Sequence, residues 1–448
     1  MRRFLIPILL AIAGLALAAK LAPGEQVAVA EHLANFPDAD AITQQMRPAV
    51  LVGMLMLPAL GGLIYSLSGT LARYVTRQFI TMLLITFGAL MLIWLLLDFQ
   101  DNLDEIKASQ DMLGTVGKLY AARLPDLIVT LLPYSLLLSV LFSLGRLSKS
   151  REVVAMTQTG RGIPRLTAPY LITGILCSIL CMGLNYQWAP RANAAEKIIL
   201  DTARGLNETA AEFVQFKNPR ANRLWMVGAF PPDSQKGAPL ERVRIVMQND
   251  DRSLRRILVA HTASWNQDTG AWSFTKAKVR KIEAGQPPVY LQDLPDPYIV
   301  KTWRETPAEI IRPGLSADQL GVPALVGWLR ARPDAKMESK LTYLTQWHNR
   351  FAQPVNCLIV VLLAIPLGLV FSRRGTSGGV ALAVFLAAGM LFLSNVSLSL
   401  GDAGHMSPIL AAWLPNLLFG ALAAYLLHRR TSGRPIYEAI RRLIPNEA

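Results

Sequence analysis

The sequence predicts a membrane protein: an α-helical transmembrane bundle with an inserted antiparallel β domain, either a sandwich or a jelly roll. Of its 448 residues 52% are hydrophobic, and the mean hydropathy is +0.33, which is too apolar for a soluble chain of this length. Several uncharged apolar runs approach the ~20 residues that a helix needs to cross a bilayer. Between them lies one polar stretch, residues 212–299, that holds no such run.

Eight apolar runs are predicted to cross the membrane, two in an N-terminal extension and six in a core. They are residues 4–19, 48–67, 80–97, 127–144, 168–188, 351–370, 380–398 and 409–427. Basic residues gather at 146–165, 372–374 and 428–442, which marks the cytoplasmic side of a multi-pass protein. The first run is compatible with a cleaved signal peptide or with an uncleaved anchor, and the second span favours the anchor.

The chain is therefore predicted to have five parts. Residues 1–70 are the extension, and 71–190 hold the first three core spans. Residues 191–312 form the β domain, 313–430 hold connecting helices and the last three core spans, and 431–448 are a basic cytoplasmic tail. Residues 23–46 are more polar and suit the periplasmic side, while residues 107–125 are mixed and helical in character.

The polar stretch reads as β structure because short segments alternate between apolar and polar residues, or are rich in β-branched residues. These segments are 223–227, 243–247, 256–261 and 273–279. Turn-forming residues separate them, which suits an antiparallel sandwich or jelly roll. Since the stretch follows a span that leaves the cytoplasm, the domain is expected in the periplasm.

A short helix is predicted on the cytoplasmic side, at about residues 148–163. Glu152 is the one acid in a basic run, and Val153 and Met156 give the helix an apolar patch too short to span. Glu152 either pairs locally with Lys149 or Arg151, or meets a basic residue in a groove of a cytoplasmic partner.

Several kinds of chemistry find no support in the sequence. There is no Walker A pattern, no H-E-x-x-H and no G-x-S-x-G, so neither ATP hydrolysis by that machinery nor these hydrolase sites are expected. The histidines are isolated and the three cysteines lie in apolar runs, so we expect no metal site and no cofactor. The net charge of +14 follows from arginines at span ends rather than from nucleic-acid binding.

From about Leu71 to Arg430 the chain resembles the LptF/LptG (YjgP/YjgQ-type) family, the permeases of the lipopolysaccharide export ABC transporter. The stretches that carry the resemblance, in order, are RYVTRQF, GRLSKSREVVAMTQTGRG, RILVAHTASWNQDTGAWSFTKAKV, WHNRFAQPVNCLIVVLLAIPLGLVFSRRGTSGG and AAWLPNLLFGALAAYLL. Residues 1–70 have no counterpart in the family pattern. Acids at 98–105 replace basic residues that some members place at the outer end of the first core span.

The resemblance implies a non-enzymatic permease subunit in the bacterial inner membrane. Its partners would be a second permease of the same family, a dimer of a separate cytoplasmic ABC ATPase and a periplasmic bridge protein, with lipopolysaccharide as substrate. The ATPase-coupling residues would be Arg151, Glu152, Val153, Met156 and Gly160. Lipid would enter the jelly roll beside Trp225, Val227 and Ile245, which strand alternation turns inward and which are otherwise ordinary core.

Two other functions remain open at this stage. One is a permease for another lipid or lipoprotein, and the other is a membrane-anchored periplasmic sensor. A sensor needs a cytoplasmic output domain, whereas this chain offers short loops and a basic tail there.

Overall fold

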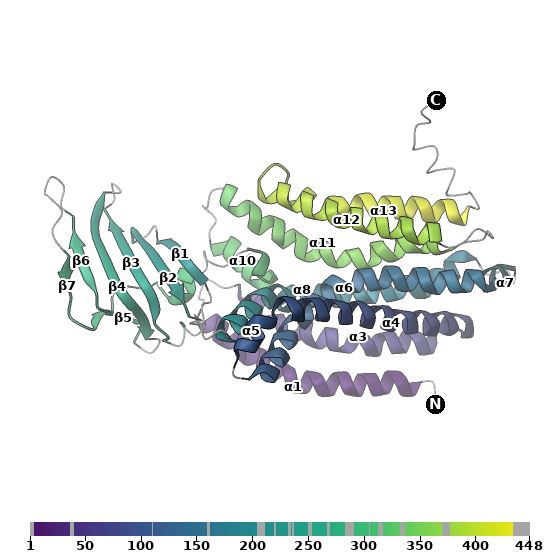
Figure 1. The fold of residues 1–448 in the computed structure, drawn as a ribbon, viewed down its shortest axis with the longest axis horizontal. Helices are drawn as coiled ribbons and strands as arrows, with labels where there is room; N and C mark the ends of the chain where they lie inside the picture. Colours follow the sequence, from purple (N-terminus) through teal and green to yellow (C-terminus); the bar gives the residue numbers. More distant parts are fainter. Residues whose placement is uncertain are drawn as a thin grey trace, which may run out of the picture.

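The computed structural model is elongated, with a helical bundle and a β domain at one end of it (Figure 1). It describes residues 4–35, 40–109, 111–158, 162–203, 211–218, 221–231, 234, 237–249, 253–266, 269–282, 291–303, 305–311, 317–331, 337–369 and 377–432. The predictions made for Gly160, for the basic turn at 372–374 and for the tail beyond residue 432 lie outside these residues.

Long helices make up most of the bundle, and shorter ones join or flank them. They are α1 (Leu5–Asn35), α2 (Ala41–Gln45), α3 (Arg47–Leu67), α4 (Thr70–Asp101), α5 (Leu103–Ala108), α6 (Met112–Lys149), α7 (Glu152–Gln158), α8 (Ile163–Ala203), α9 (Pro307–Ile311), α10 (Val322–Ala331), α11 (Met337–Gly368), α12 (Ser377–Asp402) and α13 (Pro408–Thr431). Within the described residues, eight of them, α1, α3 (with α2), α4, α6, α8, α11, α12 and α13, are long and apolar enough to cross a membrane. The predicted helical membrane bundle with an inserted β domain is confirmed.

Some helices are longer than predicted. α1 continues beyond the predicted span at 4–19 to Asn35, into the more polar residues, because this stretch is rich in helix formers such as Ala, Glu and Leu. Residues 112–125 belong to the same helix as the fourth span, and α8 continues to Ala203 beyond Pro190. Both extensions project toward the β domain and carry polar residues that the next subsection describes (Figure 1).

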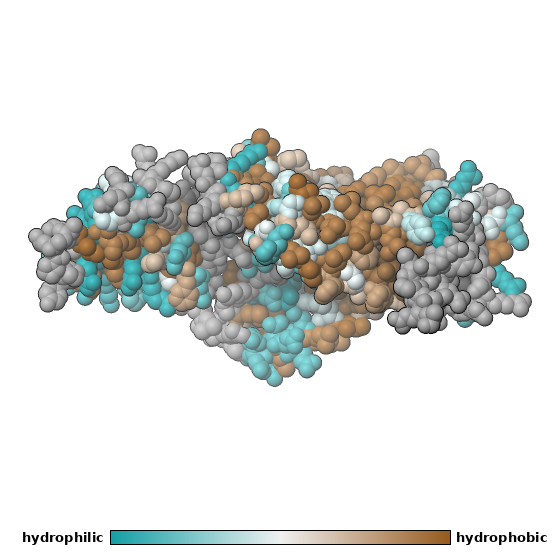
Figure 2. All heavy atoms as spheres, turned by 90° about the horizontal axis from the view of Figure 1, so that it is seen from above, coloured by the Kyte–Doolittle hydropathy of each residue, from teal (hydrophilic) through white to brown (hydrophobic). Residues whose placement is uncertain are grey.

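The spanning helices differ in how deeply they are buried. In their most apolar windows α6 and α11 are each 67% buried, whereas α3 is 6% and α4 is 11% buried. α6 and α11 are therefore the centre of the bundle, and side chains such as Leu84 (67% exposed) and Phe385 (73% exposed) face outward. Figure 2 shows hydrophobic side chains covering the helical part. Such a surface suits contact with lipid chains or with other membrane helices.

The N-terminal extension is packed against the core rather than tethered loosely. A Cβ at Gly183 of α8 would lie 2.3 Å from Cγ of Met54, so the glycine allows α3 to approach α8 closely. Arg47 forms a buried ion pair with Glu25 of α1. Asp40 also pairs with Arg330 of α10, with 2.6 Å between the Oδ1 and Nη1 atoms.

The β domain is one eight-stranded antiparallel sheet among the described residues. Its strands are β1 (Ala211–Asn218), β2 (Arg223–Phe230), β3 (Leu240–Gln248), β4 (Leu254–Asn266), β5 (Ala271–Thr275), β6 (Lys278–Lys281), β7 (Gln292–Asp293) and β8 (Tyr298–Val300). The order is β1-β2-β3-β4-β5-β8, and the first half of β4 also pairs with β6, which pairs with β7. All four predicted segments contain strand. The segment 273–279 is split between β5 and β6 by Lys276, whose φ is 50°.

The sheet curls so strongly that strands far apart in its order enclose an aromatic core. Trp225 lies on β2 and Trp272 on β5, three strands away, which in a flat sheet would separate them by ~14 Å. Their ring centroids are only 4.9 Å apart. Phe274 and Trp303 pack beside them, and both tryptophans 225 and 272 are fully buried. The curl therefore produces an inner face and an outer face with opposite character.

Candidate functional site

The turn between α6 and α8 lies at the end of the molecule away from the β domain, and it contains α7 (Figure 1). α6 ends because Arg151 takes a left-handed conformation, with a φ of 61°. The N–H of Ser150 donates to the carbonyl oxygen of Arg146 (3.0 Å), and that of Arg151 to the carbonyl oxygen of Ser148 (3.1 Å). α7 is shorter than the predicted 148–163, since α6 continues to Lys149.

Glu152, the first residue of α7, is held by two hydroxyl groups of its own chain. The Tyr74 hydroxyl, at the start of α4, donates to Oε2 (2.9 Å), and the Ser150 hydroxyl donates to Oε1 (2.8 Å). The local pairing considered from the sequence, with Lys149 or Arg151, is replaced by these contacts. A carboxylate has about four acceptor positions, so two bonds leave it able to accept from a further donor.

The apolar residues of α7 point in different directions. Val153 is 1% exposed and belongs to the core of the bundle, so it anchors α7 and cannot line a partner's groove as predicted. Met156 is half-buried against the same core. The large apolar side chain that α7 presents outward is Val154, which is 37% exposed.

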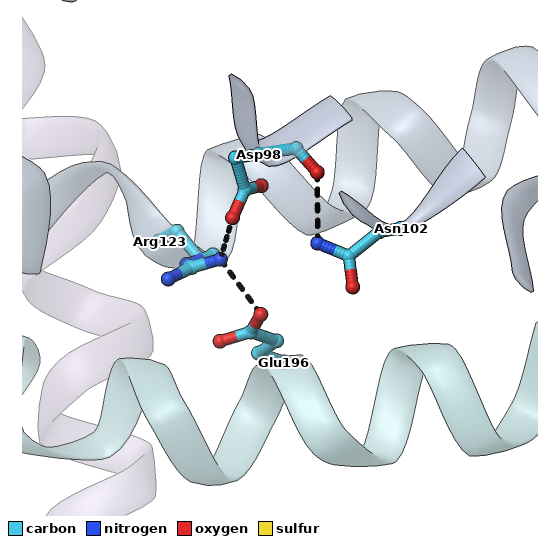
Figure 3. A network of polar contacts seen from close by, with 4 residues as sticks. All are labelled: Asp98, Asn102, Arg123 and Glu196. Carbon is cyan, nitrogen blue, oxygen red and sulfur yellow. Dashed lines mark hydrogen bonds and ion pairs between the residues drawn. The ribbon is translucent and has the colours of Figure 1, made fainter. Parts of the chain in front are cut away.

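At the opposite end of the bundle, Arg123 of α6 joins three helices (Figure 3). It pairs with Asp98 of α4 and with Glu196 of α8, where the Nη1 to Oε1 distance is 2.7 Å, and its guanidinium lies 4.5 Å from the ring centroid of Trp94. Burial raises the pKa of the Glu196 carboxyl, while Arg123 acts to lower it. Asp98 is one of the acids noted at the outer end of the first core span, and Arg123 balances its charge within the chain.

Arg350 of α11 connects the bundle with the segment that follows the β domain. Only 7% exposed, it donates from Nε to the carbonyl oxygen of Leu320 (3.2 Å) and from Nη2 to that of Asp318. It also donates from Nη1 to Oδ1 of Asn185 on α8 (3.3 Å). The residues that return from the β domain are therefore fixed to α8 and α11.

Trp225, Val227 and Ile245 all face the interior of the β domain, as alternation along β2 and β3 predicted. Each is at most 1% exposed. Trp225 contacts Trp272, and Trp303 meets it edge-on at 5.5 Å between centroids. In this conformation the positions proposed for lipid are filled by neighbouring side chains.

A buried acid closes the aromatic interior. Glu305, 1% exposed, accepts from Nε of Arg223 (2.8 Å) and from Nδ2 of Asn218 (2.8 Å). Its carbonyl oxygen accepts from Nε1 of Trp272 (2.7 Å). The guanidinium of Arg223 also lies 4.8 Å from the ring centroid of Trp303. Glu305, a single residue in the segment that follows the last strand, thus links β1, β2 and β5.

Sequence reasoning missed the partners in these networks. Tyr74 lies in the stretch RYVTRQF, but nothing in the sequence connects it with Glu152. Arg123, Arg350 and Glu305 could have been noted as ionisable residues beside apolar runs or strands, a position that requires a partner. Their partners come from other elements, so only the fold identifies them.

A comparison with known families decides what this architecture belongs to. Residues 73–429 match the family described as Lipopolysaccharide export system permease LptF/LptG. The chain belongs to the LptF/LptG family. The match begins beside Tyr74 and ends at the last span, so it includes α7, the β domain and the contacts of Arg123, Arg350 and Glu305. None of the curated proteins matches the chain.

Membership makes this multi-pass chain a permease component of a transporter, and the predicted resemblance is confirmed. The match does not reach α1, α2 and α3, which are thus additions to the family's common region. Within the described residues, no group of three or more His, Cys, Asp or Glu side chains is placed to hold a metal ion.

Proposed function

We propose that this chain is the permease subunit of an ABC transporter that extracts lipopolysaccharide from the inner membrane and passes it to a periplasmic bridge. The observation that carries the proposal is the family match across both the bundle and the β domain. A separate ATPase subunit supplies the energy. In this proposal the α7 end is cytoplasmic, the β domain is periplasmic, and a second permease of the same family completes the path.

The ATPase contact is proposed at α7. Arg151, Glu152, Val154 and Met156 lie on or beside a short helix that projects from the bundle, and Val153 fixes that helix to the core. Tyr74 ties Glu152 to the start of α4. A push on α7 would therefore reach α4 directly, without passing through the centre of the bundle.

The lipid route is proposed through the interior of the β domain. Trp225, Val227 and Ile245 line this interior, and burial of acyl chains there would be worth roughly 25 cal/mol per Å² of apolar surface. Since the aromatic side chains fill the interior, lipid entry requires them to move apart. The contacts of Glu305 at one end of the core restrain that movement.

Reconstitution in liposomes tests the proposal. The chain is combined with the ATPase and the second permease, and the lipopolysaccharide delivered to a soluble bridge protein is measured with and without ATP. We expect ATP-dependent delivery. ATP hydrolysis without delivery, together with release of another lipid or a lipoprotein, would identify a different cargo.

A further inference from the structure

The outer face of the curled sheet has a crease that runs across its strands. At one row of the sheet the backbone pairing is interrupted in β1 to β4 and in the β5–β6 link, at Phe213, Gly228, Arg242, His261 and Lys276. Three of these residues, in β1, β3 and the β5–β6 link, have positive φ values of 51°, 53° and 50°. Non-glycine residues rarely adopt this conformation, and irregularities of this kind redirect side chains.

A groove of about 710 Å³ lies along this crease. Its lining includes Val214, Val227, Val243 and Ala260, whose side chains are at most 2% exposed and point into the aromatic core. These residues can contribute only backbone to the groove, so the groove is on the outer face. The walls of the groove are two rows of outward side chains, one on each side of the row formed by these four residues.

The walls are cationic. Arg242 and Lys276 stand in one row, Arg244 and Lys278 in the other, and His261 lies between Arg242 and Lys276. Among the described residues that line the groove there is no Asp or Glu. Lys278 pairs with Asp293 at 3.2 Å, and both side chains are more than half exposed.

Gly228 gives the first row its shape. A Cβ at this position would lie 2.7 Å from Nε and 2.8 Å from Cβ of Arg242. The glycine therefore lets Arg242 lie across β2, where its guanidinium comes 5.9 Å from the ring centroid of Phe213 on β1. The aromatic contact holds the cation at the wall of the groove.

The width of the groove restricts what can occupy it. The two rows are two residues apart along the strands, which is about 7 Å. An α-helix with its side chains is ~10–12 Å across and is too wide, whereas one extended chain fits. We propose that this groove binds an extended acidic segment of a partner protein, with carboxylates paired to the guanidinium groups of Arg242 and Arg244.

The exported lipid is a less suitable occupant. Its acyl chains belong to the aromatic interior in the proposed route, and the full thickness of the sheet separates that interior from the groove. Apolar side chains also line the groove, at Phe213, Met226 and Val259, but they stand at an open surface among the cations of the walls. The inference concerns a different face from the proposed lipid route and does not depend on it.

Peptide binding to the purified full-length chain in detergent tests the inference. The probe is a short fluorescent peptide that alternates Glu and Ser, which in an extended chain places the carboxylates on one side. Arg244 is exposed and on the groove wall, so Arg244→Glu should fold and bind the peptide roughly tenfold more weakly, the loss of one charge-assisted contact. Arg255→Glu makes the same charge change on exposed β4 outside the groove and should bind as the unmodified chain does.

If Arg244→Glu and Arg255→Glu weaken peptide binding equally, the peptide is held by general electrostatic attraction and not by the groove, which would overturn the inference. Absence of peptide binding would also overturn it. A photoreactive residue at Met226, on the groove wall, should react with the bound peptide. Reaction with phosphorylated glycolipid there instead would make the groove a lipid site.

Discussion

The two ends of the helical bundle are held together in different ways. At the β-domain end, Arg123 is half-buried and Arg350 is buried, each joins several elements, and Glu305 closes the core of the domain. At the other end, Glu152 is held by Tyr74 and Ser150 through hydrogen bonds that are exposed. Val153 anchors the seven-residue helix α7 in the core, and Met156 packs half-buried beside it.

The β-domain end therefore contributes mainly to the stability of the fold, and the α7 end is suited to coupling with a partner. Buried ion pairs lose much when one partner is removed, because the remaining charge has no water to replace it. Exposed hydrogen bonds are exchanged for water at little cost. The β-domain end is therefore held more strongly, while α7 can release its contacts when a partner competes for Glu152.

Replacing Glu305 with Ala should have the largest effect. Arg223 would lose its partner beside the aromatic core, so we expect the β domain to lose about 3–5 kcal/mol of unfolding free energy. Thermal unfolding of the full-length protein, followed by tryptophan fluorescence, measures it. The matched control Asp293→Ala breaks the exposed pair with Lys278 and should cost about 0–1 kcal/mol. Similar losses in both variants would show that burial does not distinguish the two pairs.

Replacing Arg123 with Gln should cost roughly 2 kcal/mol, because Asp98 and Glu196 would then face each other without a cation. The pKa of Glu196 is already raised by burial, and loss of Arg123 should raise it further. A carboxyl with a raised pKa binds more protons in the folded state, so folding is favoured as the pH falls. The stability gap between the variant and the unmodified chain should narrow as the pH falls from neutral toward ~5. A gap that is constant or widens with acid would contradict this account of the network.

Replacing Glu152 with Arg should change stability by less than ~1 kcal/mol, because its contacts are exposed. ATPase binding should nevertheless be lost, which co-purification measures. Asp104→Arg is the matched charge reversal, on an exposed residue at the β-domain end, and should leave ATPase binding intact. Retention of the ATPase by Glu152→Arg would remove α7 from the interface.

Replacing Tyr74 with Phe should have the smallest effect on stability, well under ~1 kcal/mol, since one exposed hydrogen bond is lost. We expect the ATPase to bind and lipid delivery to fall modestly, because α4 is no longer tied to Glu152. Tyr425→Phe removes a comparable hydrogen bond, to Arg429, at the same end of the bundle and should not change delivery. A full loss of ATPase binding in Tyr74→Phe would instead make Tyr74 part of the docking surface.

The sequence was sufficient for the helical bundle, the inserted β domain and the family, because apolar runs, basic turns and strand alternation are local signals. It also placed Trp225, Val227 and Ile245 inside the domain. It could not place the contacts of Glu152, since Tyr74 is 78 residues away and only the fold brings them together. Val153 was assigned to the partner's groove because a short apolar patch does not reveal which of its members faces the core. β1 was missed, although Val214 and Phe216 alternate within it.

The central claim is that ATP hydrolysis by an ATPase bound at α7 drives lipid through the β domain. Its most direct test places a photoreactive amino acid at Val227, inside the domain, in the assembled transporter with lipopolysaccharide. The yield of lipid crosslinks should rise with ATP, and with Glu152→Arg it should remain at the level seen without ATP. A yield that does not depend on ATP, or that rises equally with Glu152→Arg, would contradict the claim.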